Sequence, residues 1–366
     1  MRWARRLAAP VASGQSDTVA FCEANIVTFC SAKRRLGERQ NGLYREGEAP
    51  ADPMPSSAGA SLSHPNQMQV EFSLPLDLVG ALARSAKGDK ANSMTKTYEV
   101  LPGQSIELLQ ELHILTRDGK MNQDSRRKLK QVFHLFQFIE PLLREALEEH
   151  PDISLVDHGA GKSYLGFLLY DLFFKEYARQ GIIWGIERRE DLVTRSRELA
   201  KRLGFSGMSF LNRSVDESLH HDSLPERIDV VTALHACDTA TDDAIRFALN
   251  KRAKHIVVVP CCQAEVASIL RKNKNKSLKK SVVSELWRHA LHTREFGSQI
   301  TNVLRCLQLE AHGYLVSVTE LVGWEHSMKN ELIIASYKNL HGSGAAERLT
   351  ELLEMVGLEE LSDRFR

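Results

Sequence analysis

The stretch "VDHGAGKSY", residues 156–164, places an acidic residue, two glycines and a Lys-Ser pair between two apolar runs. Glycine adopts backbone angles that other residues resist, and it lets the backbone approach a ligand closely. A bend of this kind between a short strand and a helix is typical of sites for nucleotide-shaped ligands. Three ligand classes are therefore open: the phosphates of ATP or GTP, a dinucleotide, and S-adenosylmethionine (SAM).

The spacing around the glycines disfavours the first two classes. A Walker A loop would need glycine at position 156, which is Val156. The dinucleotide fingerprint G-x-G-x-x-G would end at Tyr164, where a bulky side chain blocks close packing of helix on strand. SAM carries no phosphate, so its site needs only the tight turn, an acid for the ammonium group and an acid for the ribose.

Acidic residues stand where SAM would need them. Asp157 lies two residues before Gly159, and Gly161 completes the bend. Glu187 ends the next apolar run, "IIWGIE", where a carboxylate can accept both ribose hydroxyls. Dinucleotide folds use a carboxylate in the same way, so Glu187 alone does not separate SAM from NAD, and it could also be an ordinary surface carboxylate.

The segment "LVDHGAGKSYLGFLLYDLF" resembles motif I of class I SAM-dependent methyltransferases, most closely a subgroup that reads D-x-G-x-G-K-x-Y-L. Three further landmarks of that subgroup follow in order: "ALHACDTATDDAI" (233–245), "VVVPCCQAE" (257–265) and "TELVGWEHSMKNELIIASYK" (319–338). The resemblance covers about residues 120–340. It implies a methyltransferase that uses SAM, and it does not identify the substrate.

Carried over by position, the resemblance assigns Asp157, Gly159 and Gly161 to the methionine end of SAM and Glu187 to its ribose. It also implies that the loop "LNRSVDES" passes the adenine, with Asp216 or nearby backbone meeting the adenine amino group. Ser163 departs from the pattern, because many methyltransferases have a third glycine there. We expect a helix to begin at this point with the Ser163 side chain as its cap.

The candidate catalytic residues are His235, Cys261 and Cys262, at the ends of the fourth and fifth predicted strands. His235 could be a general base, since imidazole titrates near neutral pH, or a structural hydrogen-bonding group. Cys261 or Cys262 could add to C6 of a pyrimidine. The pair could also bind metal with Cys237 and His235, or simply line a narrow pocket.

Two polar residues directly follow these positions. Asp238 lies on the predicted acceptor side, and it could instead cap the helix that follows it. Gln263 could contact a base of a nucleic-acid substrate.

Basic residues bear on the partner. The net charge of the 366-residue chain is only +1, so any basic surface must be local. The segment 271–280 carries six basic residues and no acidic one: Arg271, Lys272, Lys274, Lys276, Lys279 and Lys280. A second group is Arg126, Arg127, Lys128 and Lys130. Both groups could contact phosphates or simply be solvated. RNA is the predicted substrate. A protein or small-molecule substrate, or a SAM- or RNA-binding module without turnover, are the alternatives.

The elements that must position these residues begin after residue 67. Residues 1–67 are rich in Pro, Gly, Ala and Ser and are predicted to be a disordered leader. Residues 92–150 are predicted to form a helical subdomain. Within it, Ser105 is expected to be an N-cap, and Pro141 is expected to introduce a kink or to start a second helix.

From 151 to 340, short β-rich runs alternate with helical segments, which predicts an α/β domain with a parallel sheet covered on both faces. The resemblance implies a Rossmann-like, doubly wound sheet of seven strands with the last strand antiparallel. Residues 341–366 are predicted to form an amphipathic C-terminal helix.

Six cysteines without framework spacing, and no apolar run of about 20 residues, predict a cytoplasmic protein that does not enter membranes. The sequence does not predict the oligomeric state.

Overall fold

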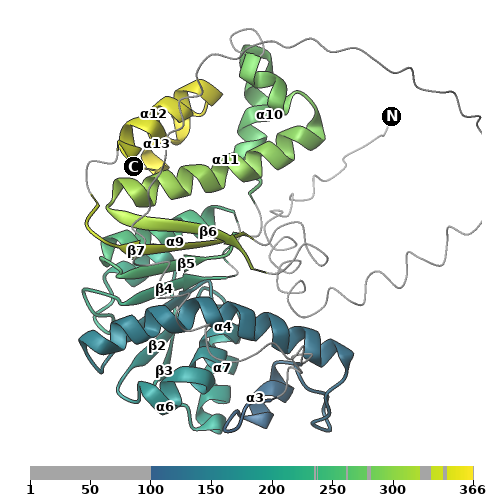
Figure 1. The fold of residues 1–366 in the computed structure, drawn as a ribbon, viewed down its shortest axis with the longest axis vertical. Coiled ribbons are helices and arrows are strands. Elements are labelled where there is room, and N and C mark those ends of the chain that lie inside the picture. The colour runs from purple at the N-terminus through teal and green to yellow at the C-terminus, as the bar shows by residue number, and fades with distance from the viewer. Residues whose placement is uncertain are drawn as a thin grey trace, which may run out of the picture. The chain divides into compact units, whose positions relative to one another are not determined.

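Seven strands form one mixed sheet in the computed structural model, in the order β3-β2-β1-β4-β5-β7-β6 (Figure 1). The strands are β1 (Ser154–His158), β2 (Ile182–Glu187), β3 (Met208–Asn212), β4 (Val230–Ala233), β5 (His255–Val258), β6 (Tyr314–Glu320) and β7 (Glu331–Tyr337). β1 to β5 pair in parallel, and β7 is antiparallel to both β5 and β6. The predicted Rossmann-like sheet with an antiparallel last strand is thereby confirmed.

The strand order fixes where a ligand can bind. The chain runs outward from β1 to β3 and then returns to place β4 on the other side of β1. The loops after β1 and β4 therefore leave the sheet in opposite directions, which opens a crevice at the carboxyl ends of these strands.

The structure describes part of the chain. The described residues are 100–234, 236, 238–260, 263–277, 282–321, 331–340 and 344–365. The predicted leader, residues 1–67, lies outside them. Within these ranges, none of the helices combines the length and apolar character that crossing a membrane requires.

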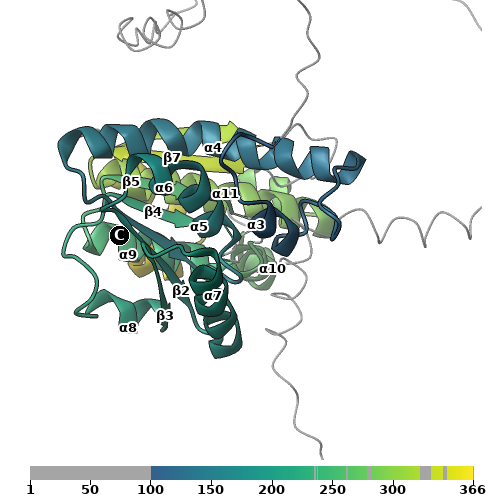
Figure 2. The same cartoon turned by 90° about the horizontal axis from the view of Figure 1, so that it is seen from below.

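Helices cover both faces of the sheet, as Figure 2 shows from below. On one face lie α3 (Ile106–Glu111), α4 (Gln123–Glu149), α5 (Tyr164–Leu169), the π-helix η1 (Tyr170–Phe174), α6 (Lys175–Tyr177) and α7 (Glu190–Leu203). On the other lie α8 (Val215–Leu219), α9 (Thr239–Asn250) and α11 (Ala290–Ala311). Each group of helices forms a hydrophobic core with the face of the sheet that it covers. Side chains alternate along each strand, so Leu155 packs into the first core, under α3 to α7, and Val156 into the second core, under α8, α9 and α11.

The N-terminal helices confirm one prediction and exclude one of two alternatives of another. The Ser105 side chain accepts a hydrogen bond from Leu108 N and caps α3, as expected. Pro141 starts no second helix, because α4 continues through it, and the alternative of a kink at Pro141 stays a prediction. Pro141 and the residue four positions earlier, Gln137, are both exposed, so water can satisfy the carbonyl that loses its intrahelical bond.

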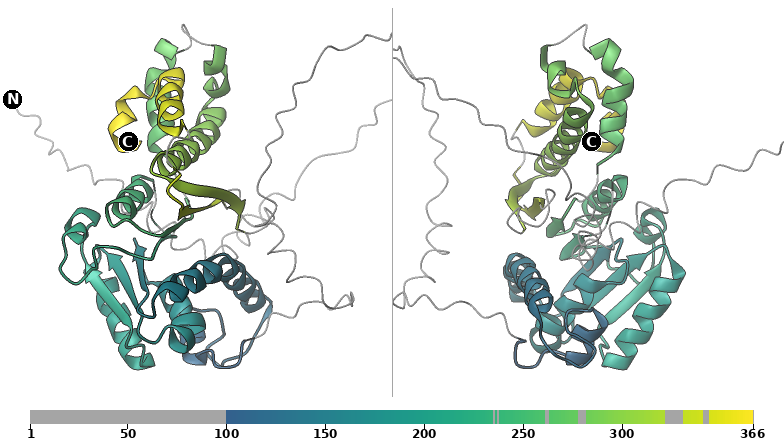
Figure 3. Two further views of the ribbon diagram at one scale, coloured as in Figure 1. Left: turned by 60° about the vertical axis from the view of Figure 1, so that its left-hand side comes forward. Right: turned by 90° about the vertical axis from the view of Figure 1, so that its right-hand side faces the viewer.

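A third core belongs to a helical module at the β6–β7 end of the sheet (Figure 3). Its helices are α10 (Glu265–Ser277), the 3-10 helix η2 (Val282–Trp287), α11, α12 (Ala345–Val356), the 3-10 helix η3 (Glu359–Leu361) and α13 (Ser362–Phe365). The buried Trp287 lies in this core together with Leu353 and Phe365. The predicted C-terminal helix thus packs against the segment between β5 and β6.

Candidate functional site

The turn after β1 is a chain of left-handed backbone conformations. Gly159, Gly161 and Ser163 have φ angles of 62°, 56° and 54°. Ala160 N donates to Ile186 O at 3.0 Å, and this bond ties the turn to the last residues of β2. Glycine tolerates these angles without steric cost, which explains the two glycines of the motif.

Glu187 lies directly beside this turn. Its Oε2 accepts a hydrogen bond from Gly161 N at 2.9 Å. Its Oε1 accepts from Arg189 N at 3.0 Å and from Arg189 Nε at 3.3 Å. Each carboxylate oxygen has two lone pairs, so the carboxylate can still accept donors from a ligand. The structure therefore brings together the predicted glycine turn and the predicted ribose acid.

Asp157 lies beneath the turn and is only 3% exposed. Thr232 Oγ1 on β4 donates to its Oδ1 at 2.8 Å. Burial raises the pKa of Asp157 from 3.8 to about 7, against the opposing effect of the Thr232 hydrogen bond and with a further increase from the charge of Glu187. A cationic partner would stabilise the ionised form of this buried carboxylate.

Ser163 corrects a sequence prediction. It is the N-cap residue of α5, as expected, but its side chain makes no cap hydrogen bond. In its left-handed conformation the buried hydroxyl has no partner within the described part of the chain. The expected cap was a β-region Ser, whose hydroxyl reaches back to the first turn of the helix.

Gly166 and Gly185 supply the close packing that a third motif glycine usually provides. A Cβ on Gly166 would lie 2.7 Å from Ser163 Oγ, and one on Gly185 would lie 2.8 Å from Phe210 Cδ1. Sequence reasoning missed both residues. Their signal was a glycine inside each of two apolar runs, which marks close backbone approach.

His158 is a third residue that sequence reasoning missed. It ends β1 on the face opposite Asp157, and its ring packs edge-on against Phe247 at a centroid distance of 4.6 Å. Burial lowers the pKa of His158 to about 3, so the imidazole stays neutral. Its role in the structure is to fill the core below the turn.

Asp216 lies apart from these groups. It is in α8, which Ser214 and Glu217 begin with a reciprocal capping box, so the expected loop is partly helical. The Asp216 side chain is 76% exposed and pairs with Arg246 at 2.8 Å. Its contact with adenine stays a prediction.

The three catalytic candidates, His235, Cys261 and Cys262, lie outside the described residues, as does Cys237. Their roles, including the metal site, stay predictions. Asp238, which follows Cys237, is described and corrects a prediction. It is the N-cap residue of α9, but its side chain makes no cap hydrogen bond to that helix; its Oδ1 instead accepts from Ala264 N at 3.0 Å and from Glu265 N at 3.3 Å, at the start of α10.

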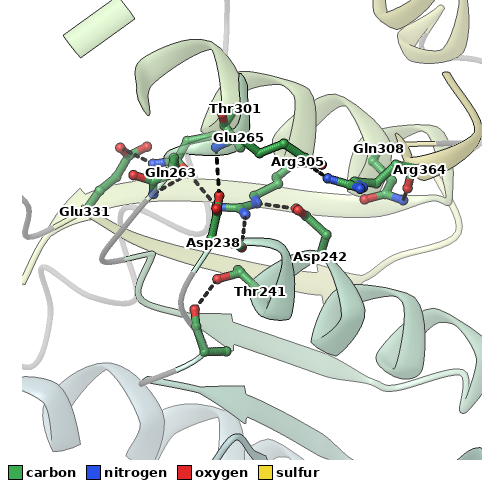
Figure 4. A network of polar contacts seen from close by, with 12 residues as sticks. Asp238, Thr241, Asp242, Gln263, Glu265, Thr301, Arg305, Gln308, Glu331 and Arg364 are labelled. Carbon is green, nitrogen blue, oxygen red and sulfur yellow. Dashed lines mark hydrogen bonds and ion pairs between the residues drawn. The ribbon is translucent and has the colours of Figure 1, made fainter. Parts of the chain in front are cut away.

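Gln263 directs its amide into the protein (Figure 4). Ser298 Oγ donates to its Oε1 at 2.6 Å, and its Nε2 donates to Asn302 Oδ1 at 3.3 Å. With both ends of the amide engaged and the residue 4% exposed, Gln263 is a structural residue here and offers no free edge to a base.

The basic residues are described in part. Arg271 and Lys272 are exposed on α10, whereas Lys279 and Lys280 lie outside the described residues, as do the side chains of Lys274 and Lys276. Arg126, Arg127 and Lys130 are exposed near the start of α4, and Lys128 pairs with Asp124 at 2.8 Å. α10 and the first turns of α4, which carry the described members of these groups, lie on the side of the sheet where the parallel strands end (Figure 1).

Residues 127–269 match the family model described as "Methyltransferase domain". This range runs from α4 into α10 and includes the glycine turn, Asp157 and Glu187.

Curated relatives are proteins named "Glutathione S-transferase C-terminal domain-containing protein". The one from Bos taurus is 26% identical over 236 residues and the one from Mus musculus 25% identical over 235. The matches cover 60% of this chain and 34% of each relative, so the chain spans about a third of the relatives' length.

Among solved structures, an rRNA methylase from Streptococcus thermophilus has 8% identity and a TM-score of 0.31, covering 51% of this chain and 87% of its own. A magnesium protoporphyrin IX methyltransferase from Synechocystis has 14% identity and a TM-score of 0.34, covering 63% and 93%.

Proposed function

We propose that this protein is a SAM-dependent methyltransferase that acts on RNA. One observation carries the proposal: the Gly161 N–H donates to Glu187 at 2.9 Å, directly above the buried Asp157, where the carboxyl ends of β1 and β2 meet. A turn of glycine backbone between two carboxylates suits a ligand that carries hydroxyls at one end and an ammonium at the other.

The residues present fit SAM. Asp157 would pair with the ammonium of the methionine end, and Glu187 would accept from the ribose hydroxyls. A Cβ at Gly159 would meet Ala236 at 3.5 Å, so the turn packs closely against the segment after β4. When bound, SAM supplies a methyl group on a positively charged sulfur, which an acceptor can displace in line.

The protein's share of that chemistry is orientation and proton removal. The turn and the two carboxylates hold one reactant at the switch between β1 and β4. The segments after β4 and β5, which contain the candidates His235, Cys261 and Cys262, would contribute to binding the other reactant. A base there would take the proton of the acceptor as the new bond forms.

RNA is the proposed acceptor because of exposed cations on two helices that flank the carboxyl ends of the strands. Arg271 and Lys272 lie on α10, and Arg126, Arg127 and Lys130 lie on α4. α4 has 27 residues, which corresponds to about 40 Å. α4 ends close to the start of β1. Because α4 is much longer than β1, its basic first turns extend past the carboxyl ends of the parallel strands. A strand of RNA lying between the two helices would meet positive charge on both sides.

Transfer of tritium from labelled SAM tests the function. The purified protein is incubated with total RNA and, separately, with total protein from a strain that lacks its gene. We expect label in RNA alone. Label in protein alone would contradict the RNA proposal, and binding of SAM without label in either fraction would favour a binding module.

Calorimetric titration tests the cofactor site. We expect wild-type protein to bind SAM and not NAD. The double substitution Gly161→Val with Glu187→Ala is expected to abolish SAM binding, because it fills the turn and removes the ribose acceptor. Glu198→Ala, at an exposed position on α7, is the matched control and should bind as wild type does. Binding of NAD in place of SAM would favour a dehydrogenase.

A further inference from the structure

Arg305 on α11 is a fully buried cation, with 0% of its side chain exposed. Its Nε donates to Asp242 Oδ1 at 2.6 Å, its Nη1 to Asn302 Oδ1 at 3.0 Å and its Nη2 to Asp238 O at 2.9 Å (Figure 4). A buried ion pair usually contributes little to stability, because desolvation offsets the attraction. A leucine could fill the same space, so stability alone does not account for this cation.

Asp238, one of the three partners of Arg305, lies in the segment after β4. Asp238 has φ 52° and ψ −121°, a conformation that a non-glycine residue keeps only when its surroundings hold it. Arg305 donates a hydrogen bond to the Asp238 carbonyl, and the Asp238 carboxylate accepts from the backbone N–H groups of Ala264 and Glu265. Asp238 thus joins the segment after β4 to the segment after β5.

Asn302, another partner of Arg305, extends the connection to β7. Asn302 Oδ1 accepts from Arg305 and from Gln263 Nε2, and Asn302 Nδ2 donates to Glu331 Oε2 at 2.7 Å. Gln263 precedes α10, and Glu331 is the first residue of β7. One guanidinium therefore links, directly or through Asn302, the segments next to the ends of β4 and β5 and the start of β7.

These segments meet at one edge of the sheet. β7 is antiparallel to β5, and its Ile333 pairs with Val258 at the carboxyl end of β5. The cofactor residues Gly161 and Glu187 belong to the turn after β1 and the end of β2, and the Arg305 network includes neither. The network therefore borders the acceptor side of the proposed site.

We propose that Arg305 is a positioning residue that sets the acceptor side of the site for methyl transfer. This proposal rests on the proposed function. The planar guanidinium is suited to the task because it donates to three acceptors in fixed directions, which a lysine ammonium cannot reproduce. Arg305 keeps these segments in register while it leaves cofactor binding to the other half of the sheet.

The test replaces the ion pair with apolar residues of similar size, Arg305→Met with Asp242→Leu. The other partners keep bonds of their own, since Gln263 still donates to Asn302, and Thr241 N still donates to Asp238 O at 3.3 Å. We therefore expect the fold and the affinity for SAM to persist, with SAM affinity within about threefold of wild type. We expect RNA labelling to slow by on the order of 100-fold, the loss that a misplacement of about 1 Å can cause.

Arg305→Lys with Asp242 retained keeps the positive charge but loses the planar guanidinium that donates to three acceptors. This variant should therefore also label RNA slowly. Arg348→Met is the matched control. Arg348 lies on α12 of the same helical module and pairs with Glu310 at 2.8 Å, with its side chain 55% exposed. This control should label at the wild-type rate.

Hydrogen exchange gives a readout that needs no RNA. In the double variant, with SAM present, amides in peptides spanning 236–241 and 263–268 should exchange at least tenfold faster, while those in 156–163 should not change. Wild-type labelling rates in the double variant, or equal loss of SAM affinity and of labelling, would overturn the proposal. If wild-type protein labels no RNA, the proposed function fails, and exchange decides the role of Arg305: unchanged exchange in both peptides refutes it.

Discussion

The affinity for SAM should depend on pH through Asp157. The pKa of Asp157 in the unliganded protein is about 7 because the carboxylate is buried beside the negative charge of Glu187. Pairing with an ammonium requires the ionised carboxylate. Each pH unit below 7 should therefore weaken binding up to tenfold, so that the titration of Asp157 alone makes the Kd at pH 5.5 about 25-fold higher than at pH 7.5.

Asp157→Asn separates this effect from other titrations. The asparagine keeps the size of the side chain and cannot ionise, so we expect weaker binding that no longer changes between pH 5.5 and 7. The ammonium of SAM is an α-amino group with an ordinary pKa of about 7.7–8.0, so weakening above pH 8 should remain in both proteins. Calorimetry from pH 5 to 9 provides the measurement. Equal wild-type Kd values at pH 5.5 and 7.5 would refute the placement of Asp157 against the ammonium.

The same carboxylate should alter the stability of the unliganded protein in a predictable direction. Its folded-state pKa lies above the ordinary 3.8, so its favourable contribution is complete below 3.8 and is lost as the pH rises through 7. At pH 8 the change from 3.8 to about 7 amounts to an unfavourable contribution of about 4 kcal/mol. Asp157→Asn should therefore raise the free energy of unfolding most at pH 8, by less than half as much at pH 5, and change it little below pH 3.8. The opposite trend in urea unfolding would contradict the assigned pKa.

Three other outcomes follow from the geometry. Ser163→Gly should stabilise the protein by about 1 kcal/mol, because it relieves a left-handed serine and removes a buried hydroxyl without a partner, against the extra chain entropy of glycine; a lower melting temperature would contradict this. Gly185→Ala should destabilise it by about 1–3 kcal/mol in urea unfolding, because the new methyl would lie 2.8 Å from the Phe210 ring; an unchanged midpoint would show that the ring moves aside freely. Arg271→Ala with Lys272→Ala should make the salt dependence of binding to a fluorescein-labelled single-stranded RNA shallower by about 1.4 in log–log slope, measured by anisotropy; an equal slope would remove α10 from the RNA interface.

Local patterns predicted the sheet well. Short apolar runs placed all seven strands, since "IIWGIE" and "ELIIASYK" can bury side chains on both faces only within a sheet. The pairing of Glu187 with the glycine turn also followed from the sequence, because parallel strands end at a common edge.

Other features depended on contacts between distant segments. A hydroxyl at Ser163 looks like a helix cap until the backbone angle is known. The Asp238 carboxylate accepts from the backbone at the start of α10, where Glu265 N is 27 residues away in the sequence. No local sequence pattern predicts a bond of this kind. Gln263 resembled a base-reading amide, and its true partners Ser298 and Asn302 lie on α11.

The third core depends on C-terminal residues that the sheet does not need. Its members come from α10, η2 and α11 on one side and from residues 349–365 on the other, with no strand residue among those described. All seven strands are complete at Tyr337, before any of the second group has been translated. Residues 100–340 therefore contain the whole sheet and its glycine turn, whereas the apolar faces of α10 and α11 that belong to the third core stay uncovered without residues 349–365. A purified chain that ends after residue 340 should retain SAM binding and fail to transfer methyl groups, and pulse proteolysis of this chain should cleave α10 before the sheet.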